Sequence, residues 1–375
     1  MRNTYKVLVG TQAFLDALHT DLDDCNRSLD AQFMTYEGDA AGLAFSERLA
    51  AKAAQGVAVR LLVDGYTDFV VSDVYAYALP LHPAVRAEHR RTQAMLAELP
   101  DRGVAVKRTA PPGWMGRFML YRNHKKMVLI DERVAYVGGI NVSDHNFAWH
   151  DFMVRIEGPL VAELVRDYAA TWTGEPLALA PVNGADDYLV SQNAGRPALL
   201  DAMLGHIDAA QHTLVIESPY LFGDRTEAHL LAAAERGVQL TLITPFNSNH
   251  GIYRVWVRAL RRRLDHPNIA LYGYQGTGGM THAKLLIADN TWGSFGSFNF
   301  FELEGVGQKD LNVFSTNADL IAQLRALVAA DLAQSVRLEP PDFAPGRFTY
   351  SAAYRLVHWW TQRQLKDPAW RAIYC

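Results

Sequence analysis

The chain has 375 residues, which is enough for two domains of ordinary size, each with its own core. Hydrophobic residues make up 49% and charged residues 20%, a composition typical of a globular protein. The formal net charge is −4, so bulk electrostatics do not favour a nucleic-acid partner, and any cationic surface must be local. Cys25 and Cys375 lie far apart and exclude a disulfide framework, so a reducing compartment such as the cytoplasm is the simplest expectation.

The sequence shows no segment of the kind that crosses a membrane. Residues 1–10 contain too short an apolar run for a signal peptide. No stretch reaches the roughly 18 apolar residues that a spanning helix needs. If the substrate is a lipid, we therefore expect a protein that docks on the membrane surface without crossing it.

Short apolar runs alternate with amphipathic stretches in the first part of the chain. The predicted order is helix, strand, helix and strand, over residues 13–28, 29–36, 43–55 and 57–64. Gly56 ends the second helix, because glycine readily adopts the conformation that follows a helix. An apolar and aromatic segment, 66–81, and a charged helix, 83–99, come next.

A polar motif follows these elements, and its members surround a short apolar run. They are His124, Lys126, Asp131, Gly138, Gly139, Asn141 and Asp151. The run 127–130 and the polar residues before it are predicted to form a strand. In a strand, His124 and Lys126 would leave the same face.

The second half repeats the order of elements. Helix, strand, helix and strand are predicted over residues 198–210, 213–220, 227–236 and 238–244. Proline, asparagine and glycine cluster at 175–185 and mark a boundary, so the predicted domains are 1–180 and 181–375. Alternating strands and helices predict the α/β class, with two similar α/β/α sandwich halves, each built on a parallel or mixed sheet that helices cover on both faces.

The polar motif also occurs a second time. This copy comprises His282, Lys284, Asp289, Gly296, Ser297 and Asn299, and Asp310 follows it. Each of the six lies 158 positions after its counterpart, and Asp310 follows Asp151 by nearly the same interval. One H-x-K-x4-D string can arise by chance, but these matches are separate coincidences. They predict one active site built from two related halves.

The residue types in the motif suit chemistry at a phosphate diester. Lysine and asparagine can bind non-bridging oxygens and the charge that grows on them, and the candidates are Lys126, Lys284, Asn141 and Asn299. One imidazole, neutral, can attack phosphorus, and the other, protonated, can give a proton to the leaving alkoxide. The two histidines must then hold opposite protonation states. Asp151 and Asp310 are candidates for orienting an imidazole and stabilising its cation.

The duplicated H-x-K-x4-D string with a following G-G/S-x-N resembles the signature of the phospholipase D superfamily, and the resemblance covers most of the chain. The flanking strings are similar to those of bacterial cardiolipin synthases, at 122–126, 137–141, 149–151, 155–159, 217–220, 236–238 and 296–299. The chain departs from the family after Asn299, where residues 300–304 replace a small polar or Arg-Ser element. Asp310 stands where glutamate is commoner.

The resemblance implies a phospholipase D-like fold, in which two α/β/α sandwich halves with mixed β-sheets have a pseudo-twofold arrangement, and an enzyme without a metal or other cofactor. It implies a phosphatidyltransferase that passes a phosphatidyl group between phospholipids through a phosphohistidine intermediate, with an alcohol such as phosphatidylglycerol, or water, as the acceptor. His124 would be the nucleophile and His282 the acid and base. Asp131 and Asp289, although part of the catalytic motif, would be more structural than chemical.

Two other functions stay open. The same two-histidine site can hydrolyse a phospholipid or a nucleic acid. Aromatic and apolar insertions near the site favour lipid, since a nuclease would show a basic, Lys-rich groove, and no nucleic-acid partner is expected. A non-catalytic membrane scaffold is disfavoured because the histidine, lysine and asparagine are intact in both halves.

Several segments are candidates for contact with a membrane surface. They are residues 69–81, 111–118 and the tail 350–374, which carry tryptophan and tyrosine, in the tail beside lysine and arginine. Packing of these aromatic side chains on the core is the alternative. An arginine-rich stretch, 254–263, can face an anionic headgroup or simply the solvent.

Overall fold

The computed structural model describes residues 2–75, 83–110, 121–175, 186–192, 197–249, 253, 257, 260–276, 280–302, 307–339 and 359. The chain divides into two compact units, Met1–Leu179 and Ala180–Cys375. We call them the first unit and the second unit, and describe each by itself. The predicted boundary segment lies almost wholly outside the described residues, as do residues 111–118 and nearly all of the tail.

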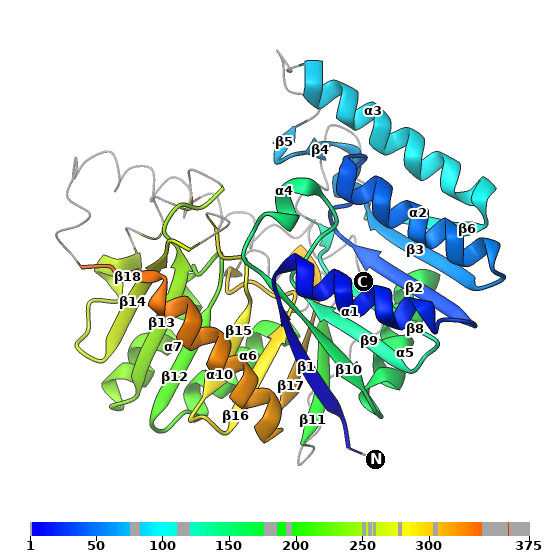
Figure 1. The fold of residues 1–375 in the computed structure, drawn as a ribbon. Coiled ribbons are helices and arrows are strands. Elements are labelled where there is room, and N and C mark those ends of the chain that lie inside the picture. The colour runs from blue at the N-terminus through cyan, green and yellow to red at the C-terminus, as the bar shows by residue number, and fades with distance from the viewer. Residues whose placement is uncertain are drawn as a thin grey trace. The chain divides into compact units, whose positions relative to one another are not determined.

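The first unit is built on a mixed sheet with the strand order β1-β10-β9-β8-β2-β3-β6 (Figure 1). These strands are β1 (Thr4–Val9), β2 (Ser28–Phe33), β3 (Ala58–Asp64), β6 (Val104–Thr109), β8 (Met127–Ile130), β9 (Val134–Gly138) and β10 (Phe152–Glu157). Neighbours from β1 to β2 are antiparallel, whereas β2, β3 and β6 run parallel. Shorter strands of this unit are β4 (Val70–Val71), β5 (Val74–Tyr75) and β7 (Arg122–Asn123).

Helices cover both faces of this sheet. One face carries α1 (Gly10–Asp23), α2 (Ala40–Ala54) and α3 (Pro83–Glu98). Phe14, Phe45 and Met95 from these helices share one buried core with Leu29 and Leu61 of the sheet. The other face is covered by α5 (Leu160–Thr173), which packs against β8, β9 and β10. The remaining helical segments are α4 (Asp144–Phe147), η1 (Gly65–Asp68) and η2 (Leu99–Arg102).

The second unit has its own mixed sheet, with the order β11-β17-β16-β15-β12-β13-β14-β18. The strands are β11 (Asp187–Gln192), β12 (Thr213–Glu217), β13 (Gln239–Pro245), β14 (Ile269–Tyr274), β15 (Leu285–Ala288), β16 (Trp292–Gly296), β17 (Gln308–Ser315) and β18 (Ser335–Arg337). Helices α6 (Ala198–Ala209) and α7 (Asp224–Glu235) share a core with one face. Helix α10 (Ala318–Ala333) packs against β14, β15 and β16.

The two sheets repeat one topology. Strands β1, β10, β9, β8, β2, β3 and β6 of the first unit correspond in order to β11, β17, β16, β15, β12, β13 and β14 of the second. In both, the strand after the H-x-K motif is antiparallel to the second strand of the unit, which pairs in parallel with the third. The prediction of two similar α/β/α halves with mixed sheets is therefore confirmed.

Most predicted elements agree with the structure to within a few residues, for physical reasons that the sequence contains. Asp39 precedes α2 and accepts a hydrogen bond from the Gly42 N–H (3.0 Å), which fixes the start of the helix. Gly56 follows α2 with a φ of +89°, a conformation that glycine adopts without strain. Strand β1 was not predicted, because it is an edge strand whose alternate residues are exposed.

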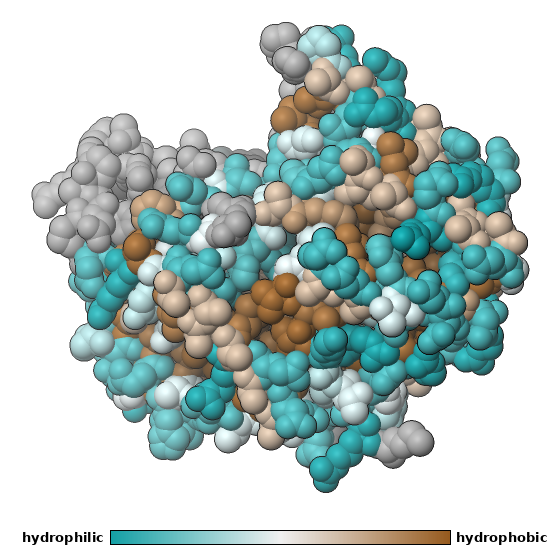
Figure 2. All heavy atoms as spheres, viewed as in Figure 1, coloured by the Kyte–Doolittle hydropathy of each residue, from teal (hydrophilic) through white to brown (hydrophobic). Residues whose placement is uncertain are grey.

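Apolar side chains lie mainly in the two cores. Figure 2 shows a face of the described residues that is largely hydrophilic between smaller apolar areas. Among the residues that the structure describes, the exposed large apolar side chains are few and scattered along the chain: Val9, Leu43, Val74, Phe246, Val336 and Trp359. Single exposed apolar residues are normal and do not define a docking surface.

Candidate active site

Both H-x-K motifs lie immediately before a strand of their sheet. Strands β8 and β15 each begin one residue after the motif lysine, so the expectation that the motif itself is a strand is wrong. The Nζ of Lys126 donates to the carbonyl of His124, and the Nζ of Lys284 donates to that of His282, both at 2.5 Å. The lysine ammonium thus binds a backbone carbonyl that could otherwise accept a hydrogen bond from a neighbouring strand.

The histidine and lysine side chains of both motifs are buried. His124 and His282 are each 5% exposed, and Lys126 and Lys284 are each 1% exposed. A buried ammonium is unfavourable unless hydrogen bonds or an anion compensate it, and its attraction for an anion is strong where water is excluded. Each unit therefore presents an imidazole beside an ammonium that is held in place by the backbone, an arrangement suited to a phosphate oxygen.

Asp131 lies at the opposite end of β8 from the motif histidine. Its carboxylate accepts hydrogen bonds from the N–H groups of Asn26 (3.1 Å), Arg27 (2.8 Å) and Ser28 (2.9 Å). Burial acts to raise its pKa, but these hydrogen bonds bring the pKa of Asp131 below its ordinary value. The five residues from Lys126 to Asp131 span about 16 Å of strand, so this carboxylate is remote from the imidazole.

Asp289 makes the same contacts in the second unit. Its carboxylate accepts from the N–H groups of Gln211 (2.9 Å), His212 (2.7 Å) and Thr213 (2.9 Å). Asp131 and Asp289 each have a φ of +52°, and each is followed by a second residue with positive φ. Both thus form the tight turn of a hairpin, and their carboxylates fasten that turn to the start of β2 or β12.

The motif asparagines follow the next strand, at the histidine end of the sheet. Asn141 comes three residues after the end of β9, and its Oδ1 accepts a hydrogen bond from the Thr35 N–H (3.1 Å). Thr35 lies just beyond β2, whose final residues pair with the start of β8. Asn299 stands at the equivalent place after β16 and is fully buried. Each asparagine therefore lies at the same sheet edge as the histidine of its own unit.

The two later carboxylates are buried against the glycine or serine of the motif. Asp151 is 2% exposed, and a Cβ on Gly139 would lie 2.3 Å from its Oδ2, so a larger residue at 139 would require this carboxylate to move. Asp310 is fully buried and accepts a hydrogen bond from the Ser297 hydroxyl (2.7 Å). The contacts thus place each carboxylate beside its own motif, and the orienting role of Asp151 and Asp310 stays a prediction.

Sequence analysis missed a pair of carboxylates that also obeys the repeat. Asp144 and Glu302 each follow the motif asparagine by three residues and are 158 positions apart. Asp144 accepts from the N–H of Ala41 (2.8 Å) in the first turn of α2. Burial raises the pKa of Glu302, and hydrogen bonds from the backbone N–H groups at the start of α7 oppose this shift. Both carboxylates anchor the asparagine segment to a helix, and the matching interval was the signal that could have found them.

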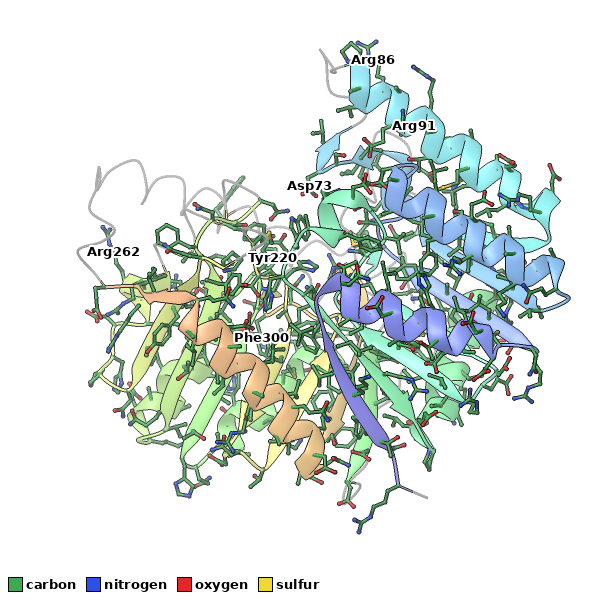
Figure 3. All side chains as sticks on the ribbon, in the orientation of Figure 1. Asp73, Arg86, Arg91, Tyr220, Arg262 and Phe300 are labelled. Carbon is green, nitrogen blue, oxygen red and sulfur yellow. The ribbon has the colours of Figure 1, made fainter. Side chains whose placement is uncertain are left out.

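This anchoring explains the departure from the family after Asn299. Phe301 forms a β-bridge with Phe222, and the Phe222 N–H donates to the Phe300 carbonyl (2.8 Å). Phe300 is fully buried (Figure 3). Tyr220 stacks on Tyr253 at a centroid distance of 4.1 Å. Phe300 and Phe301 are therefore part of the aromatic packing that precedes α7.

Buried ion pairs flank the first motif. The Arg122 guanidinium lies 2.8 Å from Asp64 Oδ1, and the Lys125 ammonium lies 2.8 Å from Asp167 Oδ1. All four side chains are at most 3% exposed. Burial raises the pKa of Asp64 to about 6 despite the attraction of Arg122. Arg122 and Lys125 are thus each paired with one acid.

The second unit lacks these basic residues. Met280 and Ala283 stand 158 positions after Arg122 and Lys125. Glu217 occupies the register position of β12 that Gln32 occupies in β2. The loss of two cations and the gain of a carboxylate make the second motif more acidic than the first.

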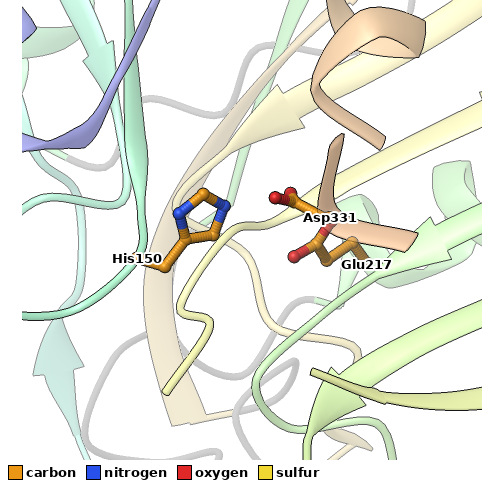
Figure 4. A group of neighbouring side chains, drawn as sticks. All are labelled: His150, Glu217 and Asp331. Atoms are coloured by element: carbon orange, nitrogen blue, oxygen red, sulfur yellow. The ribbon is translucent and has the colours of Figure 1, made fainter. Parts of the chain in front are cut away.

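The Glu217 carboxylate contacts the residue that precedes the second motif. The hydroxyl of Thr281, the residue before His282, donates to Glu217 Oε1. A carboxylate oxygen of Glu217 lies within 4.8 Å of one of Asp331, and both residues are fully buried (Figure 4). Burial raises the pKa of Tyr274 to about 12, and the charges of Asp331 and Glu217 act in the same direction.

No helix among the described ranges has both the length and the apolar character needed to span a bilayer.

The fold and the paired motifs define a phospholipase D-like enzyme, and comparison with known proteins agrees. Residues 19–172 and 203–332 match the family model described as cardiolipin synthase, PLD-like domain. The matched residues are more than half of the chain, so the protein belongs to this family. It is an enzyme of the phospholipase D superfamily.

The chain is similar to several cardiolipin synthases A. It is 27% identical over 351 residues to that of Pseudomonas syringae pv. syringae (strain B728a), covering 88% of this chain and 68% of the relative. It is 26% identical over 360 residues to that of Pseudomonas putida (strain W619), covering 91% and 71%.

Two solved structures share the fold. Phosphatidylserine synthase of Haemophilus influenzae Rd KW20 aligns with a TM-score of 0.70 and 12% identity, over 99% of this chain and 94% of that one. Polyphosphate kinase from Porphyromonas gingivalis aligns with a TM-score of 0.60 and 12% identity, over 96% and 53%. At this identity the likeness concerns the fold alone.

Proposed function

We propose that the protein is a membrane-peripheral phosphatidyltransferase that transfers a phosphatidyl group between phospholipids, as a cardiolipin synthase does. The observation that carries the proposal is the repeated site: a buried imidazole with a lysine fastened to its backbone, at equivalent positions in both units. The similarity to cardiolipin synthases A supports phosphatidylglycerol as the lipid to test first.

The proposed reaction has two displacements at one phosphorus atom. A nitrogen of His124 attacks phosphorus, a P–N bond forms, and the P–O bond to the first alcohol breaks while His282 donates a proton to that oxygen. His282 then takes a proton from the acceptor hydroxyl, whose oxygen attacks phosphorus as the P–N bond breaks. Each cycle returns both histidines to their starting state.

The motif cations and amides would stabilise the charge on phosphorus in both displacements. Lys126, Lys284, Asn141 and Asn299 bind the non-bridging oxygens in this proposal. Asp151 and Asp310 would orient the imidazoles and stabilise their cationic forms. Asp131 and Asp289 would stabilise the hairpin turns and would not contact the substrate. Their hydrogen bonds at the far ends of β8 and β15 support this role.

The charge difference between the units supports the proposed order of the histidines. A nucleophilic imidazole must be neutral, whereas a proton donor must begin as the cation. Arg122 and Lys125 beside the first motif are each paired with an acid, so these pairs add no net charge there. The Glu217 and Asp331 carboxylates near the second motif favour a cation there, which suits His282 as the acid.

The decisive experiment is to incubate the purified protein with phosphatidylglycerol vesicles and identify the products by mass spectrometry. We expect cardiolipin and glycerol. His124→Ala and His282→Ala should each lower the rate by at least about a thousandfold, since removal of a nucleophile or acid disables the whole cycle. Phosphatidic acid as the sole lipid product would indicate a hydrolase, and rapid cleavage of DNA without cardiolipin would contradict the proposal.

A further inference from the structure

The two residues before the first motif histidine are held by a carboxylate that the motif does not include. Asp64 is the last residue of β3 and is fully buried. Its Oδ2 accepts a hydrogen bond from the N–H of Asn123 (2.6 Å), the residue before His124. Its Oδ1 accepts from the Tyr66 N–H (2.7 Å) and from Arg122 Nη1 (2.8 Å). One carboxylate therefore fixes both residues that lead into the histidine.

The Asn123 side chain is held as well. Gln32 Nε2 of β2 donates to Asn123 Oδ1 (2.9 Å), and Asn123 Nδ2 donates to the Thr109 hydroxyl (3.3 Å) at the end of β6. Strands β2, β3 and β6 are neighbours and run parallel, so their carboxyl ends meet at one edge of the sheet (Figure 1). Asn123 is thus hydrogen-bonded to all three strands through its N–H group and its side chain.

The chain through His124 is consequently fixed on both sides of the histidine. Before it, Asn123 is bonded to Asp64 and Gln32. After it, the Lys126 ammonium binds the His124 carbonyl. Attack on phosphorus requires the nitrogen to be in line with the leaving oxygen, and a displacement of about 1 Å can lower a rate by about a hundredfold. Fixing the backbone limits such displacements of the ring.

The second unit has a proline in place of this carboxylate. By the registers of β2 with β3 and of β12 with β13, Pro245 stands where Asp64 stands, and each ends its strand. A proline side chain accepts no hydrogen bond. Thr281 stands where Asn123 stands, and its hydroxyl binds a carboxylate of β12 instead. The hydrogen bonds from the end of β3 therefore belong to the half that carries His124.

We propose that Asp64 and Gln32 are positioning residues for His124, an inference that rests on the proposed function, in which His124 is the nucleophile. Both side chains are fully buried and bonded to Asn123, so they act through the chain and not on the substrate. They hold the residue before His124 so that the imidazole meets phosphorus in line for formation of the P–N bond. The proline of the second unit fits a division in which one histidine alone bonds to phosphorus.

Asp64→Asn is a sharp test because the two carboxylate oxygens face different donors. Oδ1 faces the Tyr66 N–H and the Arg122 guanidinium, whereas Oδ2 faces the Asn123 N–H. The single amide oxygen of asparagine should take the side with two donors, one of them charged, which turns its NH2 group toward Asn123. The substitution then breaks the bond to Asn123 while the size of the side chain is kept.

The measurement is the single-turnover rate at which excess protein releases glycerol from phosphatidylglycerol vesicles, because this release accompanies formation of the P–N bond. We expect Asp64→Asn to release glycerol at least about tenfold more slowly per folded molecule, while the steady-state KM for phosphatidylglycerol stays within about twofold of the parent. Urea unfolding gives the folded fraction, so a smaller amount of folded protein is not mistaken for slower chemistry.

Asp30→Asn is the matched control. Asp30 is also a buried carboxylate of this sheet, and it accepts two hydrogen bonds from Arg60 (2.6 Å each). It lies opposite Leu129 in the register of β2 with β8, toward the turn that Asp131 forms. Loss of this buried ionic contact should lower stability, but the rate of glycerol release per folded molecule should stay within about twofold of the parent.

Gln32→Met is the second variant, and it decides the question if Asp64→Asn does not fold. Gln32 Oε1 is buried and accepts no hydrogen bond from the residues that the structure describes. The substitution exchanges this oxygen for the Asn123 oxygen that loses its donor, so stability should change little. Glycerol release should slow by about threefold or more, again without a change in KM.

The outcomes separate the positioning role from the proposed function. Rates equal to the parent in folded Asp64→Asn, or in Gln32→Met where the first variant does not fold, would overturn the positioning role alone. No release of glycerol by the parent would overturn the proposed function and this inference with it.

Discussion

His206 is a half-buried histidine that the proposed chemistry does not use. It lies on α6, stacks on Trp292 at a centroid distance of 3.5 Å, and its Nε2 lies 2.9 Å from the Tyr188 hydroxyl. Burial lowers the pKa of His206 from 6.5 to about 4. The folded second unit therefore holds this ring neutral over a pH range in which the unfolded chain protonates it.

This difference predicts a loss of stability in weak acid. Between pH 6.5 and about 4 the unfolded state binds a proton that the folded state does not, so stability falls as the pH falls. Solvent screening at the partly exposed ring limits the expected effect to about 1–2 kcal/mol. His206→Phe, which keeps the stacking and does not titrate, should show a smaller loss in urea unfolding at pH 6.5 and 4.5.

The exposed His212 provides the matched control for this measurement. His212→Gln, also in the second unit, should lose stability with pH as the parent does. An equal pH dependence in the parent and His206→Phe would show that other groups dominate acid unfolding.

At the scale of elements, the hairpins β8–β9 and β15–β16 combine chemistry at one end with anchoring at the other. The histidine and lysine precede the first strand, and the motif aspartate makes the turn. Three backbone N–H groups converge on that aspartate in each unit. The motif therefore forms one structural unit, with the histidine and lysine at one end of the hairpin and the hydrogen-bonded turn at the other.

Substitution of the turn aspartates should affect stability more than chemistry. In Asp131→Asn and Asp289→Asn, one carboxylate oxygen becomes an amide that cannot accept from an N–H, so we expect a loss of about 1–3 kcal/mol. The rate per folded molecule should stay within about threefold of the parent. Urea unfolding and single-turnover rates measure the two effects, and a thousandfold slower reaction of a fully folded variant would assign these aspartates to the chemistry.

Elements with strong periodicity or a clear end signal were predictable from the sequence. The helix ended by Gly56 and the strand at 127–130 agree with α2 and β8. Strand β1 was missed because an edge strand buries too few of its residues to show a pattern. The strand was wrongly extended to the motif residues themselves. Sequence spacing does not reveal the hydrogen bond from Lys126 Nζ to the His124 carbonyl.

At the scale of the molecule, the repeat identified the family and the paired architecture before any coordinates. Identical spacing shows that residues are equivalent, and this is why the members of both motifs could be named. The spacing of the motif residues gives no information about which charges are paired, because the partners are distant in sequence. Asp64 pairs with Arg122, and Asp167 pairs with Lys125.

Each unit encloses a core of its own, and the two cores share no residue. A single melting temperature is therefore an incomplete description of this chain, because two cooperative regions can lose their order separately. Scanning calorimetry should resolve a profile broader than one two-state transition, with acid moving the component that belongs to the second unit. A sharp, single two-state peak would show instead that the two halves melt as one.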